Sequence, residues 1–218
     1  MKRKVCIIGL DGMGFQNLHI FLDRLSLNSL SRVVNKGFVT SFISVPPYTP
    51  LSWTSIFTGV NPGKHGVYGF LKAIKSSYYF RVFPCTSFDV SYPRLFEILS
   101  MFNMRSVVIN VPLTHPINGI IGLRNLVIIS DWASPKQFIY PSCYEEKYKE
   151  YLVEPPHRWA IAVNEESYVK SVENYLKKRI HLYYDLLEEA DFSLFIICLL
   201  YTSPSPRDLS TSRMPSSA

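Results

Sequence analysis

The sequence predicts an α/β fold, in which helices cover both faces of a mostly parallel sheet. The first observation is a set of continuous apolar runs at 4–10, 105–111 and 191–197, which are typical of strands buried on both faces. The second is that helical patterns separate these runs, as in the stretch that carries Leu18, Phe21, Leu22 and Leu25. Strands that alternate with helices favour right-handed crossovers within one layered sandwich.

The remaining elements follow from turn and cap residues. Proline is favoured in the first turn of a helix, glycine after its last turn, and asparagine as an amino-terminal cap. In chain order we expect a helix closed by Gly37, a strand over 39–45, a short helix from Pro50 to Gly59, a turn over 61–63, an edge strand over 78–83, a helix that starts at Pro93, and a long helix capped by Asn164 that runs through Glu189.

Composition excludes several classes of protein. Of the 218 residues, 47% are hydrophobic and 18% charged, so the chain as a whole is not intrinsically disordered. The four cysteines are scattered without a C-x-x-C pair, which favours a reduced, cytoplasmic location. No apolar run reaches the ~18 residues of a membrane span. The net charge of +6 is dispersed, and the basic cluster 177–179 is interpreted as a helix surface, so no nucleic-acid partner is predicted.

The last 21 residues differ in character from the rest of the chain. Residues 198–218 are rich in serine and proline, a composition typical of disorder. The segment 198–208 resembles the translation of a transposase sequencing adaptor, and 209–218 resembles the index and primer that follow it. We therefore expect a domain over 1–197 and a disordered, non-native read-through tail over 198–218.

Asp11 is the first candidate for chemistry. It directly follows the first predicted strand, and ligands of open α/β sheets bind at the carboxyl ends of the strands. Gly12 and Gly14 leave room for a metal ion beside the carboxylate. An aspartate that only caps the loop explains the local sequence equally well. A dinucleotide site is disfavoured, because the glycines follow G-x-x-G-x-G and no acidic residue ends the next predicted strand.

Thr49 is the second candidate. It precedes Pro50 and is expected to be the amino-terminal cap of the short helix. Its hydroxyl and the free N–H groups there would stabilise a phosphate at the positive end of the helix dipole. A hydroxyl at this position could also ligate a metal and attack phosphorus. Ordinary helix capping is the simpler explanation when this motif is taken alone.

Taken together, the two motifs are more specific. Ile8-Gly9-Leu10-Asp11-Gly12 is followed by P-P-x-T-P-x-x-W-T-S-x-x-T-G-x-x-P-G-x-H-G, which begins at Pro46. This pair resembles the type I phosphodiesterase/nucleotide pyrophosphatase branch of the alkaline phosphatase superfamily. In that family the threonine nucleophile lies nine positions before a Thr-Gly pair, the separation of Thr49 from Thr58 here. The resemblance extends over residues 4–197.

The resemblance implies an alkaline-phosphatase-like α/β/α sandwich and a hydrolase of phosphate esters with two divalent metal ions, usually zinc. Asp11 and Thr49 would bind one ion, Thr49 would be the nucleophile, and Ser52 would contact the phosphate of a small-molecule substrate. The remaining family ligands follow the last strand, where the adaptor-like sequence begins. The sheet is therefore expected to be incomplete at its carboxyl-terminal side and this chain alone to be inactive. The alternative is a non-catalytic phosphate- or nucleotide-binding module. His65 is expected to bond locally rather than to bind metal.

Overall fold

A computed structural model describes residues 4–10, 14–41, 43–44, 46–76, 79–117, 125–131, 134–151, 164–189 and 192–197. Asp11 and Gly12 lie outside these residues, as does the whole tail 198–218, so the predictions made for them stay predictions.

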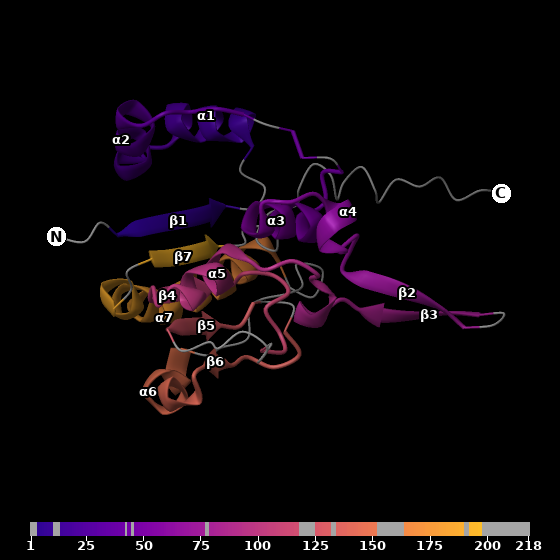
Figure 1. Ribbon diagram of the computed structural model, residues 1–218. Coiled ribbons are helices and arrows are strands. Elements are labelled where there is room, and N and C mark those ends of the chain that lie inside the picture. Colours follow the sequence, from indigo (N-terminus) through magenta and orange to yellow (C-terminus); the bar gives the residue numbers. More distant parts are fainter. Residues whose placement is uncertain are drawn as a thin grey trace.

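A five-stranded sheet forms the centre of the molecule and confirms the α/β prediction. Its strands are β1 (Val5–Leu10), β4 (Ser106–Ile109), β5 (Leu126–Ile129), β6 (Ile139–Tyr140) and β7 (Phe192–Ile197). They lie in the order β1-β7-β4-β5-β6 (Figure 1), and every pair is parallel except β5–β6. The last described strand, β7, is thus inserted between β1 and β4. This crossover order brings segments far apart in sequence to one carboxyl edge.

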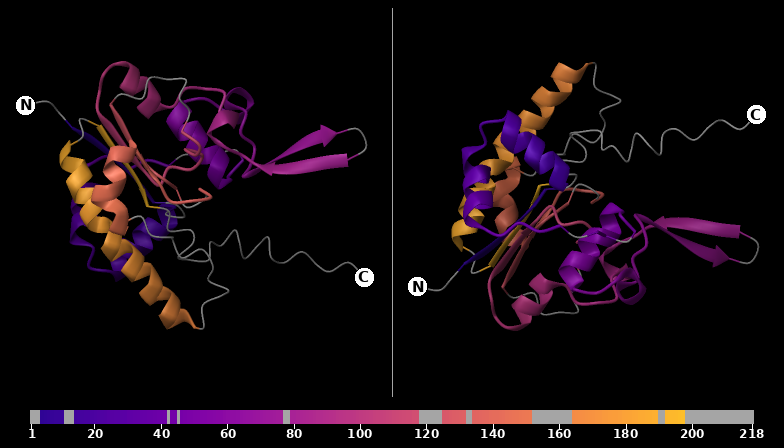
Figure 2. Two further views of the ribbon diagram at one scale, coloured as in Figure 1. Left: turned by 90° about the horizontal axis from the view of Figure 1, so that it is seen from below. Right: turned by 90° about the horizontal axis from the view of Figure 1, so that it is seen from above.

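Helices pack on both faces of the sheet (Figure 2). On one face, Phe57 of α3 (Thr49–Thr58) and Phe96 of α5 (Leu95–Met101) pack with Val108. On the other face, Leu182 and Leu186 of α7 (Glu165–Glu189) pack with a second set of strand residues, Val107, Ile109, Val127 and Ile129. Because successive side chains of a strand point to opposite faces, the unbroken apolar run of β4 serves both layers.

The long helix α7 runs antiparallel to the strands. The amide of Ser167 donates to Asn164 Oδ1 at 2.8 Å, which confirms Asn164 as its cap. At its carboxyl end, Lys4 Nζ donates to the carbonyl of Glu188 at 2.7 Å, a favourable position for a cation. Since Lys4 precedes β1, this end of α7 lies at the amino edge of the sheet. Its first half therefore lies at the carboxyl edge.

The helices α1 (Phe15–Arg24) and α2 (Asn28–Lys36) stand beyond β1 (Figure 1) and have no buried residue. The strand expected over 39–45 was wrong for its described residues 39–41, 43 and 44, which are in no strand. Ile43 is 88% exposed, and no described strand pairs with this segment. Hydrophobic composition alone does not make a strand where no neighbouring strand supplies backbone partners.

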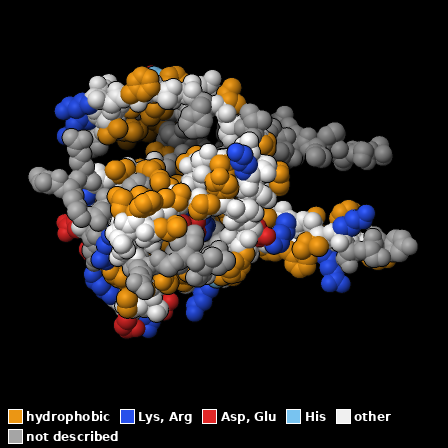
Figure 3. Space-filling model, in the orientation of Figure 1, with side chains coloured by type: hydrophobic (Ala, Val, Ile, Leu, Met, Phe, Trp, Pro, Cys, Tyr) orange, Lys and Arg blue, Asp and Glu red, His pale blue; other side chains and the backbone are white. Residues whose placement is uncertain are grey.

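A two-stranded hairpin projects from the domain. It consists of β2 (Leu71–Ser76) and β3 (Tyr79–Pro84), which are antiparallel. The expected edge strand is confirmed as β3, whereas β2 was not predicted. Figure 3 shows hydrophobic and basic side chains along the hairpin, and Tyr79 and Phe80 at its far end are 78% and 70% exposed.

Short helical turns complete the description. These are α4 (Pro62–His65), η1 (Ser87–Asp89), η2 (Ser142–Tyr144), α6 (Glu145–Tyr148) and η3 (Lys149–Tyr151). The helix expected to start at Pro93 begins instead at Leu95, because Arg94 occupies the cap position and its amide donates to Glu97 Oε2 at 2.7 Å. The turn expected over 61–63 is the start of α4.

Candidate functional site

The helix α3 carries both site residues that the structure describes, Thr49 and Ser52. Thr49 is its first residue and Tyr48, with extended backbone, is the cap. The prediction that Thr49 is the cap was therefore wrong by one position, with Pro50 in the second place of the helix. Gly59 ends the helix as expected, at φ 68°, a left-handed conformation that glycine adopts without strain.

The amino-terminal end of α3 has free hydrogen-bonding capacity. The first intrahelical bond runs from the amide of Ser52 to the carbonyl of Tyr48 at 3.0 Å, so the amides of Thr49 and Leu51 precede the helical ladder. Pro50 has no N–H. The half-buried Thr49 hydroxyl has no hydrogen-bond partner among the described residues. A hydroxyl and free amides at the positive end of a helix dipole are suited to an anion.

Ser52 lies nearly one turn further along α3 and is half-buried. Its Oγ is 2.7 Å from Ser44 Oγ, and Ser44 Oγ is 3.4 Å from the carbonyl of Pro46, to which it can donate. This hydrogen bond between Ser44 and Ser52 therefore holds the segment before α3 against the first turn of α3. Sequence reasoning missed Ser44, because it falls in the segment interpreted as a strand.

The carboxyl end of β1 lies beside α3 (Figure 1). Ile7 of β1 packs against the core cluster that contains Phe57, with Trp53 also packed against it. β1 ends at Leu10, so Asp11 is the next residue of the chain. The structure thus brings the elements that carry the two motifs together. The meeting of the Asp11 and Thr49 oxygens stays a prediction, because Asp11 lies outside the described residues.

His65 connects α3 to the residues that follow α4 through two hydrogen bonds. It is fully buried, with Nδ1 accepting from the amide of Val67 at 3.1 Å. The ring proton must then be on Nε2, which lies 3.0 Å from Ser55 Oγ and donates to it. This arrangement is the local bonding expected for His65. Burial lowers the pKa of this imidazole below its ordinary value.

The lowered pKa of His65 predicts that acid destabilises the fold. Below pH ~6.5 the unfolded chain protonates this histidine more readily than the folded chain, whose imidazole has the lower pKa, so stability falls as the pH decreases through this range, by at most about 1.4 kcal/mol per pH unit. Urea unfolding of wild type and His65→Gln between pH 7.5 and 5 measures this. The substitution should flatten the pH dependence, whereas His181→Gln, at an exposed position, should not. Equal slopes in all three proteins would contradict the assignment.

A buried carboxylate follows β5 at the same edge of the sheet. Asp131 is 1% exposed, and its Oδ2 accepts from the amide of Thr114 at 3.5 Å and its Oδ1 from Ser134 Oγ at 3.4 Å. These contacts join two loops and agree with a packing role. Within the described ranges, no group of three or more histidine, cysteine, aspartate or glutamate side chains is placed to hold a metal ion. No described helix has both the length and the apolar character needed to cross a membrane.

Comparisons with known proteins agree with this architecture. The model of the type I phosphodiesterase / nucleotide pyrophosphatase family matches residues 5–194. Phosphonoacetate hydrolase from Sinorhizobium meliloti 1021, solved in complex with phosphonoacetate, is similar in structure, with a TM-score of 0.57 and 16% sequence identity. The match covers 97% of this chain and 51% of the hydrolase, so the chain spans about half of that protein's length. At this identity the likeness shows a shared alkaline-phosphatase-like fold. None of the curated proteins matches the chain.

Proposed function

The chain belongs to the type I phosphodiesterase / nucleotide pyrophosphatase family, and we propose that it carries the amino-terminal part of a metal-dependent hydrolase of small-molecule phosphate esters with Thr49 as the nucleophile. The observation that supports this most is the start of α3. There the Thr49 hydroxyl, which has no partner among the described residues, lies at the positive end of a ten-residue helix, beside the carboxyl end of β1 and inside the family-matching segment.

In this proposal the residues at the start of α3 bind the phosphate and one of them attacks it. The amides of Thr49 and Leu51 bind phosphate oxygens and offset their charge. Thr49 Oγ attacks phosphorus, so that a new Oγ–P bond forms as the bond to the leaving oxygen breaks, and the hydroxyl proton passes through solvent water to the leaving oxygen. Water then cleaves the Oγ–P bond and restores the threonine. In this proposal Ser44 Oγ donates to Ser52 Oγ rather than to the carbonyl of Pro46, and this leaves the single Ser52 proton free to donate to a phosphate oxygen.

The metal ions of this proposal need more ligands than these residues offer. Asp11 and Thr49 would supply two donors, whereas a catalytic zinc site has three protein ligands. The two residues therefore do not complete a metal site, and no step above depends on one. When bound, divalent ions such as zinc lower the pKa of an attacking hydroxyl and stabilise the charge that develops on the leaving oxygen. We propose that further ligands, which the family resemblance places after the last strand, complete two such metal sites.

Trapping the covalent intermediate tests the nucleophile directly. A chain in which the predicted read-through tail 198–218 is replaced by family sequence that continues the domain is mixed with an aryl phosphodiester and divalent metal, quenched in acid, and digested for mass spectrometry. We expect the phosphoryl adduct on Thr49, and none on Thr54 or Thr58, whose hydroxyls donate to the carbonyls of Pro50 at 2.6 Å and Thr54 at 2.7 Å. Phosphate binding without any adduct or turnover would favour the alternative, a non-catalytic binding module.

Ser52→Ala should lower kcat by about ten- to hundredfold, because one hydrogen bond to a charged phosphate oxygen is worth roughly 1.5–3 kcal/mol. The measurement is steady-state hydrolysis of the same aryl phosphodiester. Ser44→Ala is the matched control. It removes the partner of Ser52 but not the donor, and should have a smaller effect on kcat. A larger loss in Ser44→Ala than in Ser52→Ala would show that the pair acts only by holding the chain.

A further inference from the structure

Arg179 of α7 is a fully buried arginine with unused donors. Its exposed fraction is 0%. Nη1 donates to Asn110 Oδ1 at 2.9 Å and to the hydroxyl of Tyr175. The guanidinium carbon lies 5.3 Å and 6.0 Å from the ring centroids of Tyr175 and Tyr183. Nε and Nη2 are buried and have no hydrogen-bond partner among the residues that the structure describes.

The positive charge of Arg179 is not balanced within its surroundings. In the part of the chain that the structure describes, no carboxylate forms an ion pair with it. An arginine keeps its charge under all physiological conditions, and a buried charge without a partner is strongly unfavourable. The two tyrosine rings compensate for only part of this cost. The site therefore requires an anion.

The free donors of Arg179 also indicate the kind of anion. Nε–H and one N–H of Nη2 point in parallel from the same edge of the guanidinium, whereas Nη1 is held on the other side by Asn110 and Tyr175. This edge matches two oxygens of one carboxylate or phosphate group, which it binds through paired hydrogen bonds.

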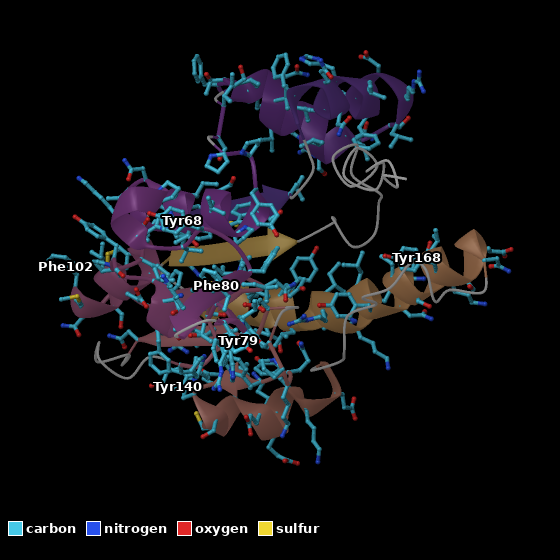
Figure 4. All side chains as sticks on the ribbon, turned by 90° about the vertical axis from the view of Figure 1, so that its right-hand side faces the viewer. Tyr68, Tyr79, Phe80, Phe102, Tyr140 and Tyr168 are labelled. Carbon is cyan, nitrogen blue, oxygen red and sulfur yellow. The ribbon has the colours of Figure 1, made fainter. Side chains whose placement is uncertain are left out.

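The position of Arg179 places this edge where ligands bind in open α/β sheets. Asn110 directly follows β4, with a left-handed φ of 59°. Asn110 Nδ2 also donates to the hydroxyl of Tyr183 at 3.4 Å, which ties the end of the strand to α7. Figure 4 shows that α7 extends past the end of β7 to the labelled Tyr168. Arg179 thus lies at the carboxyl edge, on the helix layer opposite α3.

We infer that the Nε–Nη2 edge of Arg179 is an oxyanion subsite, which takes a carboxylate or phosphate group and is held in place by Asn110 and Tyr175. The group comes either from a small molecule at the carboxyl edge or from a carboxylate side chain of the protein itself. The inference stands on the buried guanidinium and is independent of Thr49.

The test is a titration of the 218-residue chain, labelled with [15N]arginine, with sodium phosphate and separately with sodium acetate at constant ionic strength. The Nε–H resonance of Arg179 is identified by its loss in Arg179→Lys. If that variant does not fold, the resonance is identified by its selective shift in Tyr175→Phe. For a small-molecule anion we expect a saturable downfield shift and slower exchange with water. Asn110→Ala should weaken the apparent affinity about tenfold, whereas Arg81→Lys, on the hairpin, should not change it.

Two further results of this titration have distinct meanings. A resonance that is already downfield, protected from exchange and insensitive to both anions would identify a carboxylate of the protein as the occupant. A resonance that exchanges rapidly, at the position of a free guanidinium, and that neither anion moves would overturn the inference. Thr49→Ala distinguishes this site from the proposed catalytic one, because the shift at Arg179 should persist in that variant whether or not Thr49 is the nucleophile.

Discussion

In a chain in which the predicted read-through tail 198–218 is replaced by family sequence that continues the domain, Thr49→Ala should abolish hydrolysis of an aryl phosphodiester, with kcat/KM reduced by about four orders of magnitude or more. Removal of a nucleophile that forms a covalent intermediate has effects of this size, because the remaining groups still bind substrate but cannot form the bond to phosphorus. Initial rates of nitrophenol release measure the loss.

Two controls separate this chemical role from a structural one. The Thr49 hydroxyl bonds to no described residue, so thermal unfolding of Thr49→Ala should stay close to that of wild type. Thr49→Ser keeps the hydroxyl and should keep a measurable fraction of the rate. An alanine variant that folds normally and hydrolyses the ester within tenfold of wild type would eliminate Thr49 as the nucleophile.

Three of the five strands of the central sheet, β1, β4 and β7, were predicted from local sequence, because each lies in a nearly continuous apolar run, whereas β5 and β6 were not given a range. The run 105–111 became β4 and the run 191–197 became β7, and the alternation with helices correctly indicated parallel pairing. The segment 39–45 has a similar composition, yet its described residues form no strand. Composition reports what can be buried, whereas a strand also needs a neighbour for its backbone groups, and that neighbour is set by the tertiary fold.

Only the part of the candidate site that lies in sequence motifs could be predicted. The start of α3 follows from Pro50 and the end from Gly59, and both are local signals. Arg179 was interpreted as part of a basic helix surface, together with Lys177 and Lys178, and this was wrong for Arg179 alone. Its spacing from Tyr175, Leu182 and Leu186 follows one face of a helix. Helical periodicity was therefore the signal that could have placed it among buried residues.

Glu97→Ala should produce the largest loss of stability among single substitutions at polar positions, about 3 to 5 kcal/mol in the free energy of unfolding. Glu97 and Arg94 are 5% and 4% exposed and form an ion pair. Glu97 also accepts from the amide of Arg94, while Arg94 Nη1 donates to the carbonyl of Leu113 at 2.7 Å. Loss of the carboxylate leaves a buried guanidinium without its anion and the amide of Arg94, at the start of α5, without its side-chain acceptor. Equilibrium unfolding in urea measures the change.

Further variants at the same pair show which part of the loss comes from the charge. Glu97→Gln keeps an acceptor for the amide of Arg94 and should cost less than Glu97→Ala. Replacing Arg94 and Glu97 together by leucine removes the unpaired cation, so the double variant should be more stable than Glu97→Leu alone. Glu146→Ala, at an exposed position of α6, should change stability by less than about 0.5 kcal/mol. If the double variant were the least stable of the set, the Arg94 contact with Leu113 would matter more than the ion pair. The loop that follows β4 would then be held in place mainly by that contact.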